Sequence, residues 1–258
     1  MSGADSRISP ESGSQPTLPT ERAVRVRALF DRIAWRYDFI NDLQSAGLHR
    51  LWKRRVAQLA AVGPGHRVLD VCCGTGDVAR ELARTGAEVV AVDFSEQMLN
   101  VARRRSRRWG PWAGRITFLW ADALCLPFEE RAFDAVTIAY GLRNLADWRA
   151  GLRELLRVTR PGGRLVILEF GIPNRLWWRR VYYGYLRWFV PFWGWCFAGD
   201  RAAYAYILNS LVAYPGQHGV AKVLNEMGCR EVQVYNLIGG AMSLHRAIKG
   251  AAERLQPN

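Results

Sequence analysis

Lysine is scarce in this chain, and so are the patterns that mark secreted, zinc-binding or membrane-spanning proteins. Only 3 of its 36 basic residues are lysine. Its 5 cysteines are an odd number and include no CxxC pair, which excludes a disulfide framework and a zinc ribbon and favours a reducing cytosol. The N-terminus has no apolar stretch, so we expect no signal peptide. No run of about 18 uncharged apolar residues predicts a membrane-spanning helix.

The charge that is present is strongly one-sided. The 258 residues carry 36 basic and 23 acidic side chains, a formal net charge of +13, and 50% of them are hydrophobic. Such a composition is that of a folded protein with a substantial core, either one large domain or two small ones. The surplus of arginine indicates an anionic partner, either nucleic acid or a membrane surface, with genome composition as the alternative explanation.

The chain divides into segments of different composition. Residues 1–20 are rich in Ser, Gly, Pro and Thr and are predicted to be a disordered tail. Residues 21–258 form one predicted domain, in which 21–61 has helical periodicity with a break at Gly47. Residues 171–227 are mostly helical and rich in aromatic side chains, and they end in a helix over 217–227.

Between these helical parts the pattern alternates between strand and helix. Strands are predicted at 67–72, 88–92, 115–120, 134–139 and 164–170, and helices at 77–84, 95–108 and 147–159. Asp77 and Ser95 are the expected N-caps, and Pro161-Gly162-Gly163 is expected to stop the last helix. Two further strands, 230–238 and 242–248, close the chain. We therefore predict an α/β fold with a doubly wound, mostly parallel sheet and an antiparallel pair at one edge.

A glycine-rich loop follows the first predicted strand. Gly74 and Gly76 permit a tight turn at the start of the next helix, where the backbone can approach a ligand. Asp93 ends the second strand, 17 residues after Gly76, and an acid there can accept hydrogen bonds from both hydroxyls of a ribose. A tight turn that binds no ligand is the alternative interpretation of the glycines alone.

Two cofactors fit this loop, and acids elsewhere distinguish them. The spacing Gly74-x-Gly76-x-x-Ala79 also matches a dinucleotide fingerprint. However, Asp70 precedes the loop, where it can fix the loop or meet a cationic ligand, and Asp122-Ala123 follows the third strand, where a carboxylate can take the amine of adenine. Ribose, adenine and a cationic sulfonium without a pyrophosphate describe S-adenosylmethionine.

Seven separated motifs occur along the chain in a distinctive order. They are Tyr37-Asp38-x-x-Asn41-x-x-x-Ser45-x-Gly47-x-His49-Arg50-x-Trp52, Asp70-Val-Cys-Cys-Gly-Thr-Gly-Asp77, Gly141-Leu-Arg-Asn144, Arg157-Val-x-x-Pro161-Gly-Gly163, Leu168-Glu-Phe170, Tyr206-Ile-Leu-x-Ser210 and Gly239-Gly240 with Leu244-His245. Together they resemble the motifs of one family, the quinone C-methyltransferases of the menaquinone and ubiquinone pathways, which belong to the class I methyltransferases. The resemblance covers about residues 22–250.

The resemblance implies methyl transfer from S-adenosylmethionine to a ring carbon of a prenylated quinol. Demethylmenaquinol is the expected acceptor, with demethylphylloquinol and the ubiquinol precursor as alternatives. A more distant alternative within the fold is a methyltransferase for RNA or another small molecule, and a non-catalytic binding protein is a third. Residues 171–200 differ most from the family, so they bear on the choice of acceptor.

The resemblance also assigns roles to individual residues. The expected cofactor-binding residues are Asp70, Gly74, Thr75, Gly76, Asp93, Phe94, Asp122, Ala123 and Ala139, the last standing where some members have serine. A lid over the cofactor, formed by the helical residues 21–61, and contacts with the acceptor are expected from Tyr37, Asp38, Asn41, His49 and Tyr206. The alternative for the lid residues is a helix that simply packs on the sheet. No metal is expected.

Activation of the acceptor needs a base, or a cation that stabilises an oxyanion. Arg143 and Asn144 follow the fourth strand, at the edge where ligands bind in this kind of sheet. His245 is the third expected catalytic residue, because an imidazole can act as a base near neutral pH. A purely structural role is the alternative for His245 and for His49.

An aromatic and basic stretch, residues 175–197, lies on the expected acceptor side. It contains 11 aromatic residues and 4 arginines, and Arg187 and Pro191 argue against a spanning helix. Because Trp and Tyr favour the membrane interface and Arg favours anionic headgroups, we predict a peripheral contact with the cytoplasmic face of a membrane. The alternative is a cap that closes the acceptor pocket. We expect no nucleic-acid partner, and the sequence leaves both a monomer and a homodimer as alternatives. The run Arg103-Arg-Arg-Ser-Arg-Arg108 is interpreted as a solvated helix face.

Overall fold

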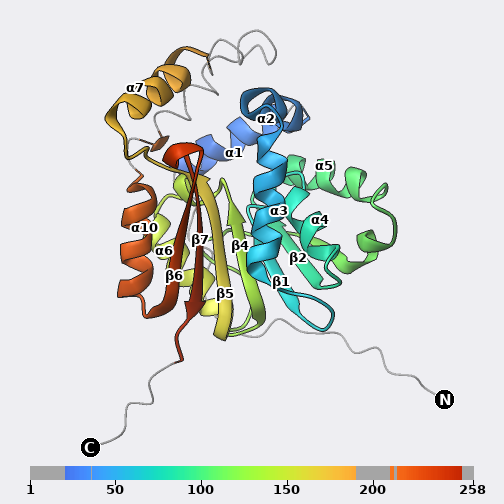
Figure 1. Ribbon diagram of the computed structural model, residues 1–258. Helices are drawn as coiled ribbons and strands as arrows, with labels where there is room; N and C mark the ends of the chain where they lie inside the picture. Colours follow the sequence, from blue (N-terminus) through green and yellow to red (C-terminus); the bar gives the residue numbers. More distant parts are fainter. Residues whose placement is uncertain (1–20, 36, 190–209, 212–213, 252–258) are drawn as a thin grey trace, which may run out of the picture.

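The computed structural model places a seven-stranded sheet at the centre of the protein (Figure 1). It describes residues 21–35, 37–189, 210–211 and 214–251. The strand order is β3-β2-β1-β4-β5-β7-β6. Strands β1 to β5 pair in parallel, whereas β7 is antiparallel to β5 and to β6. The predicted doubly wound sheet with an antiparallel edge pair is confirmed. The predicted tail, residues 1–20, lies outside the described residues.

Each predicted strand is present at nearly its predicted place, because each is a short run rich in β-branched and other apolar side chains. The strands are β1 (Arg67–Val71), β2 (Glu88–Asp93), β3 (Ile116–Trp120), β4 (Phe133–Ala139), β5 (Thr159–Phe170), β6 (Cys229–Leu237) and β7 (Met242–Lys249). Strand β5 starts five residues before its predicted start at 164. Pro161-Gly162-Gly163 was expected to stop the preceding helix, which ends at Val158, and the three residues lie inside β5, where the register with β4 shifts.

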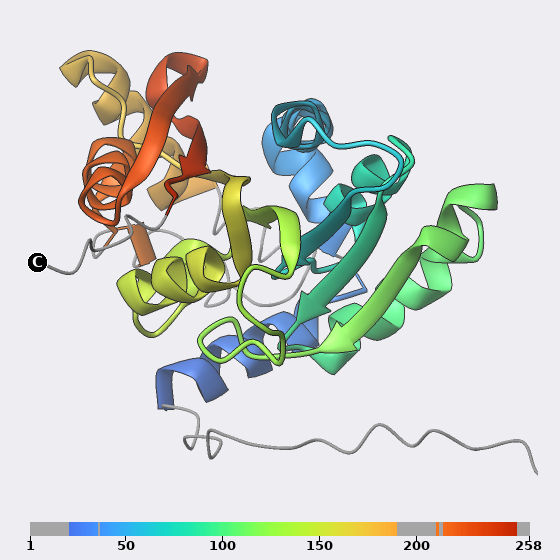
Figure 2. The same ribbon diagram turned by 90° about the horizontal axis from the view of Figure 1, so that it is seen from below.

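Alternate strand residues point to opposite faces of the sheet and enter two separate cores. On one face Leu69 and Val136 pack with α6 (Trp148–Val158) and α10 (Gly216–Glu226). On the other face Val68 and Ala135 pack with α3 (Leu48–Ala60) and α4 (Asp77–Ala83). Figures 1 and 2 show helices covering both faces of the twisted sheet. This layering is what a βαβ pattern with strands buried on both sides predicts.

The helix starts agree with the sequence at one predicted cap and differ at the other. Helix α5 (Glu96–Ser106) begins after Ser95, whose hydroxyl accepts the Met98 N–H at 3.1 Å. Helix α4 was expected to be capped by Asp77, but Gly76 is the N-cap and Asp77 is the first helical residue. Gly76 has a φ of 86°, so the turn needs a left-handed residue there, and the carboxylate of Asp77 is used in ion pairs instead.

The N-terminal segment forms three helices, one more than the single break at Gly47 predicted. They are α1 (Glu21–Ile33), α2 (Tyr37–Ser45) and α3, with Gly47 in the left-handed conformation before α3. The additional break lies between Ile33 and Tyr37. Because the chain breaks there, α1 and α2 are separate helices. The apolar side of α1 packs against Met98 of α5.

Helices from distant parts of the sequence gather at the carboxyl ends of the parallel strands. A third apolar cluster joins Leu29 and Ile33 of α1 to Met98 of α5 and to Tyr182 and Leu186. The last two belong to α7 (Leu176–Gly184) and the π-helical turn η3 (Tyr185–Phe189). Figure 1 shows α1, α2 and α7 at the same end of the sheet. Among the described residues, no helix is long and apolar enough to cross a membrane.

Candidate active site

The shape of the glycine-rich loop between β1 and α4 is set by the Trp109 ring, which lies close to it, and by a hydrogen bond to Asp93. Gly74 and Gly76 have positive φ angles of 55° and 86°. A Cβ atom on Gly76 would lie 2.8 Å from Cη2 of Trp109, so no larger residue fits without displacing that ring. The N–H of Gly74 donates to Oδ2 of Asp93 at 2.8 Å. The loop therefore presents its backbone at the carboxyl end of β1, with its shape set by Trp109 and Asp93.

Asp93 ends β2 and holds two neighbouring backbone segments. Its Oδ2 accepts from Gly74 N–H, and its Oδ1 accepts from Ser95 N–H at 2.9 Å. Burial raises the pKa of this carboxyl to about 6, although the backbone N–H groups of Ser95 and Gly74 oppose the rise. At neutral pH the group is mostly an anion, and it retains lone pairs that can accept from a ribose diol.

A cavity opens beside this loop and contains about 840 Å³ of free space, including its open mouth. Eight of the sequence-predicted site residues line it: Tyr37, Gly74, Asp93, Phe94, Asp122, Ala123, Ala139 and Asn144. Phe30, Met98 and Tyr140 add apolar wall. A wall that holds two acids and several aromatic rings suits adenosine, because its adenine ring is flat and carries an amine donor and its ribose carries hydroxyl donors.

Asp122 lies on the cavity wall, in the turn that follows β3. Its Oδ1 accepts the Leu124 N–H at 2.9 Å, which fixes the turn that carries Ala123. The ring of Phe94 packs against Trp120 with centroids 5.2 Å apart, and Trp120 Nε1 donates to the Phe94 carbonyl at 2.9 Å. These contacts stiffen the wall on which the adenine amine is expected to be recognised.

Asp70 lies below the loop, on β1, and is not part of the cavity wall. It is buried, and its Oδ1 accepts from the Thr137 hydroxyl at 2.7 Å. Within the described part of the chain its Oδ2 has no hydrogen-bond partner. Burial raises the pKa of Asp70 to about 7, while the Thr137 hydroxyl lowers it. A buried carboxyl that lies off the cavity wall fits the first of its two expected roles, which is to fix the end of β1 beneath the loop.

Arg143 follows β4 and makes a buried ion pair. Its Nη1 lies 2.5 Å from Oε1 of Glu169 on β5, and the two side chains are 5% and 0% exposed. The guanidinium also donates to the Tyr140 carbonyl at 2.9 Å and to the Ser210 hydroxyl at 3.2 Å. The Phe170 ring lies 4.6 Å from Cζ. Arg143 is thus a fixed cation behind the cavity wall, not a mobile surface group.

Asn144 is the residue beside Arg143 that reaches the cavity. Its Nδ2 donates to the same Tyr140 carbonyl at 2.9 Å. This bond directs Oδ1 away from the backbone, and that oxygen is buried without a hydrogen-bond partner among the described residues. A buried acceptor of this kind needs a donor, and a ligand hydroxyl in the cavity would supply one.

The two histidines predicted for the site lie elsewhere. His245 on β7 is fully buried, and its Nε2 contacts the Gln217 carbonyl of α10 at 2.9 Å. Burial lowers its pKa, with Gln217 opposing. His49 on α3 lies 2.8 Å from Asp42 Oδ1, and burial together with the nearby Lys53 lowers its pKa. Neither imidazole borders the cavity, so we assign the proton chemistry to neither.

The predicted lid residues on α2 split into two groups. Tyr37 lines the cavity, and its Cε1 lies 4.0 Å from the position of a Cβ on Gly74. Asp38 points instead to the loop, where the Thr75 hydroxyl donates to its Oδ1 at 2.7 Å. Asn41 contributes its carbonyl to the Ser45 hydroxyl and is not on the wall. Tyr206 lies outside the described residues.

Sequence reasoning missed several residues that shape the site. Glu169 was quoted only as part of a motif, although an acid inside an apolar strand is a signal of a buried partner. Tyr140 and Phe30 carry no such signal. Arg105 was counted with a solvated run but contacts the glycine loop. No cluster of three potential metal ligands is found in the described ranges.

Comparison with known proteins agrees with this geometry. The model of the ubiE/COQ5 methyltransferase family matches residues 19–249. The ubiquinone/menaquinone biosynthesis C-methyltransferase UbiE of Ectopseudomonas mendocina is 42% identical over 241 residues, 92% of this chain and 93% of that protein. UbiE of Pseudomonas aeruginosa strain PAO1 is 39% identical over 251 residues, 96% and 97% of the two chains.

Solved structures support the fold. A SAM-dependent methyltransferase from Aquifex aeolicus superimposes with a TM-score of 0.57 at 19% identity, covering 82% of this chain and 97% of that one. Phosphoethanolamine N-methyltransferase 2 of Haemonchus contortus, solved with S-adenosylhomocysteine, gives 0.63 at 16% identity, covering 92% and 62%. The fold is that of a class I methyltransferase and the cofactor is S-adenosylmethionine. The chain therefore belongs to the ubiE/COQ5 methyltransferase family.

Proposed function

We propose that this protein transfers a methyl group from S-adenosylmethionine to a ring carbon of a prenylated quinol, with demethylmenaquinol as its acceptor. Demethylphylloquinol and the ubiquinol precursor are the close alternatives. The observation that carries the proposal is a single cavity whose wall holds both Asp93, suited to a ribose, and the orphaned Oδ1 of Asn144, suited to a ligand hydroxyl. The relatives named for ubiquinone and menaquinone biosynthesis support the substrate class.

The cofactor would be held by residues on the wall near the loop. Asp93 accepts from the ribose, Asp122 from the adenine amine, and Phe94 packs on the adenine. When bound, S-adenosylmethionine supplies an electrophilic methyl group on a cationic sulfonium. The main task of the protein is to align that group with the acceptor carbon, and alignment alone can contribute about 7–11 kcal/mol to lowering the barrier.

The acceptor carbon becomes a good nucleophile when a quinol hydroxyl is polarised or loses its proton. Asn144 Oδ1 would accept that hydroxyl, and the Arg143 cation behind it would stabilise the oxyanion that develops. The acceptor would gain the methyl group at its ring carbon and would release one proton to solvent, while the sulfur would become a neutral thioether. Glu169 keeps the guanidinium of Arg143 in place through their ion pair at 2.5 Å.

A methylation assay tests this function. Purified protein with methyl-labelled cofactor should transfer label to demethylmenaquinol faster than to demethylphylloquinol or the ubiquinol precursor, when the three carry equal prenyl tails. Asp93→Ala serves as the control and should weaken cofactor binding by about 1–3 kcal/mol through lost charge-assisted hydrogen bonds. No label in any quinol would overturn the proposal. Label in RNA alone would favour the alternative within the fold.

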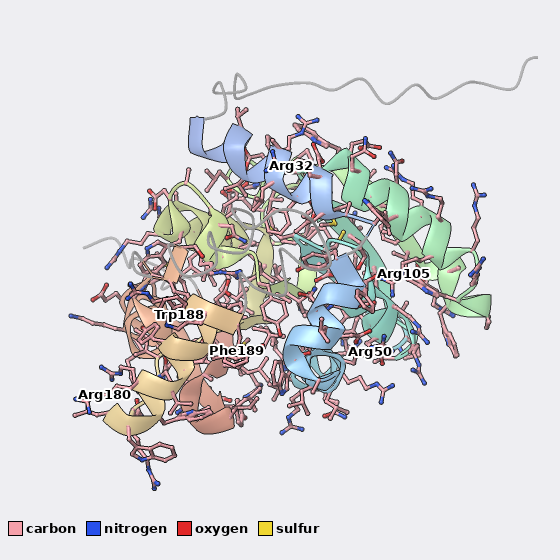
Figure 3. The ribbon with its side chains drawn as sticks, turned by 90° about the horizontal axis from the view of Figure 1, so that it is seen from above. Arg32, Arg50, Arg105, Arg180, Trp188 and Phe189 are labelled. Carbon is pink, nitrogen blue, oxygen red and sulfur yellow. The ribbon has the colours of Figure 1, made fainter. Side chains whose placement is uncertain are left out.

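We further propose that the aromatic segment brings the enzyme to the cytoplasmic face of a membrane, where a prenylated acceptor resides. Its described part, 175–189, is amphipathic: Tyr182 and Leu186 are buried, whereas Trp177, Trp188 and Phe189 are 60%, 66% and 57% exposed. Arg175, Arg180 and Arg187 are also exposed, and Figure 3 shows Arg180, Trp188 and Phe189 on the face above the strand ends.

No acidic residue occurs in the sequence between Glu169 and Asp200. Exposed tryptophan beside unopposed arginine suits an anionic bilayer surface. Residues 190–197 lie outside the described residues.

Vesicle flotation tests the membrane contact. The protein should float with vesicles that contain phosphatidylglycerol, less so at high salt, and Trp177→Ser/Trp188→Ser should bind about tenfold more weakly because two apolar surfaces are lost. Leu119→Ser removes an exposed apolar side chain from the edge strand β3 and should leave flotation unchanged. If the wild type does not bind anionic vesicles, the segment acts only as a cap on the acceptor pocket.

A further inference from the structure

One arginine of the run 103–108 does not belong to a solvated face. Arg104, Arg107 and Arg108 are exposed, as the sequence predicts, but the side chain of Arg105 is only 31% exposed. It turns from α5 toward the glycine loop and the N-terminal helices, and Figure 3 labels it on this side of α5. Its guanidinium is therefore placed to link these elements.

The guanidinium of Arg105 contacts three elements at once. Its Nη1 donates to the Thr75 carbonyl of the glycine loop at 3.0 Å and lies 2.7 Å from Oδ2 of Asp38 on α2. Its Nη2 donates to Oδ1 of Asp77 at 2.7 Å, at the start of α4. The planar fork of an arginine suits this arrangement, since its two nitrogens reach two carboxylates in fixed directions.

Both carboxylates in this network have a second partner. The Thr75 hydroxyl donates to Oδ1 of Asp38 at 2.7 Å, so Thr75 is tied to α2 directly and also through Arg105. Oδ2 of Asp77 lies 2.7 Å from Nζ of Lys53, whose side chain is 7% exposed. The loop end of the network is therefore anchored in the body of the protein by Lys53, while the α2 end depends on Asp38.

The network bears on the cofactor because its two ends frame the cavity. Tyr37, next to Asp38, lines the cavity together with Gly74, next to Thr75. Movement of α2 away from the loop would separate Asp38 from Arg105 and Thr75 and would open this wall. The chain shows no other ion pair between α2 and α4 or α5 among its described residues.

We propose that Arg105 is a positioning residue for the cofactor: it holds α2 against the glycine loop through Asp38 and Asp77, and the opening of this contact limits cofactor exchange. Arg105 touches neither the cavity nor the reacting atoms. The proposal rests on binding of S-adenosylmethionine and not on the identity of the acceptor, so it and the quinol proposal can fail separately.

The test is the rate at which S-adenosylhomocysteine leaves the protein, measured by stopped-flow tryptophan fluorescence. Arg105→Gln should release it about tenfold faster and raise the KM for S-adenosylmethionine by a similar factor, since several charge-assisted hydrogen bonds are lost. The KM for the acceptor should be unchanged. The release rate of Arg105→Lys should lie between those of wild type and Arg105→Gln, because one ammonium cannot bridge both carboxylates.

Two further variants separate positioning from general loosening. Arg104→Gln removes a side chain on the exposed side of the same helix, where it donates to the Asn100 carbonyl, and this variant should behave as wild type. Asp38→Asn should release the product faster than wild type, and adding it to Arg105→Gln should have little further effect, since both variants remove the same Asp38–Arg105 ion pair. Equal release rates in Arg105→Gln and wild type, or fully additive effects of the two variants, would overturn the proposal.

Discussion

Glu169→Gln lowers the free energy of unfolding by about 3–5 kcal/mol, the usual cost when one partner of a buried ion pair is removed. This large expected effect arises because the guanidinium of Arg143, 5% exposed, would remain buried without its countercharge. Urea denaturation at pH 7.5, followed by tryptophan fluorescence, measures it. Glu231→Gln is the matched control: it removes an acid whose side chain is 60% exposed from its pair with Arg246, and exposed pairs contribute about 0–1 kcal/mol.

A double variant separates the structural role of this pair from its catalytic role. Arg143→Met/Glu169→Leu replaces both charges by apolar side chains and should recover most of the lost stability, as happens when buried ion pairs are replaced by hydrophobic residues. It should not recover methyl transfer, because the cation that stabilises the acceptor oxyanion is gone. If the stable double variant retains normal turnover, Arg143 has no role in the reaction. If Glu169→Gln matches Glu231→Gln in stability, the pair does not hold the site together.

The fold could be predicted from the sequence because its signals are local. Strands such as β2, whose residues 89–92 are Val-Val-Ala-Val, are continuous apolar runs, and the helices between the strands have the period and caps of short amphipathic helices. Ser95 was found as an N-cap because a hydroxyl at that place can accept the N–H three residues later. Asp77 was misplaced because its type suits a cap, while the ion pairs that it makes with Lys53 and Arg105 come from distant helices.

The cavity wall was predictable where it follows the ends of the strands. Asp93 ends β2, and Asp122 and Asn144 follow β3 and β4 within a short turn, so all three lie at the carboxyl ends of parallel strands, which meet at one edge of the sheet. His245 failed this test for a geometric reason. Alternate residues of a strand point to opposite faces, and His245 shares the parity of Ala247, which packs on the face covered by α6 and α10.

The Arg105 network could not be predicted, since its partners are set by tertiary packing. Asp38, Asp77 and Arg105 lie on three different helices, and Asp38 is 67 residues away from Arg105. In the sequence Arg105 looks the same as Arg104, although a turn of 100° about the axis of α5 separates the two side chains. Only the packed arrangement of α2, α4 and α5 shows which of the two faces inward.

Asp70→Asn should change how stability depends on pH. Burial raises the pKa of Asp70 to about 7 from its ordinary value of 3.8, so the native protein holds a proton between these values that the unfolded chain has released. The stability of the wild type therefore falls as pH rises through this window. An asparagine cannot ionise, so between pH 5 and pH 8 the variant should gain about 2–3 kcal/mol relative to wild type.

The test is this change with pH and not the difference at one pH, because the Nδ2 of an asparagine at position 70 would replace an oxygen that has no partner and adds a constant cost.

Asp77→Asn is the control of opposite sign. Burial alone would raise the pKa of Asp77, but Lys53 and Arg105 lower it well below its usual value, so this carboxylate stabilises the native state at neutral pH and less as pH falls. Asp77→Asn should therefore be less stable than wild type at pH 8, and this difference in stability should become smaller as the pH falls.

The Asp70→Asn protein should also bind S-adenosylmethionine more weakly, which would explain why a destabilising charge is kept beneath the loop. Urea midpoints for Asp70→Asn and wild type that change in parallel from pH 5 to pH 8 would show that Asp70 does not titrate in this range.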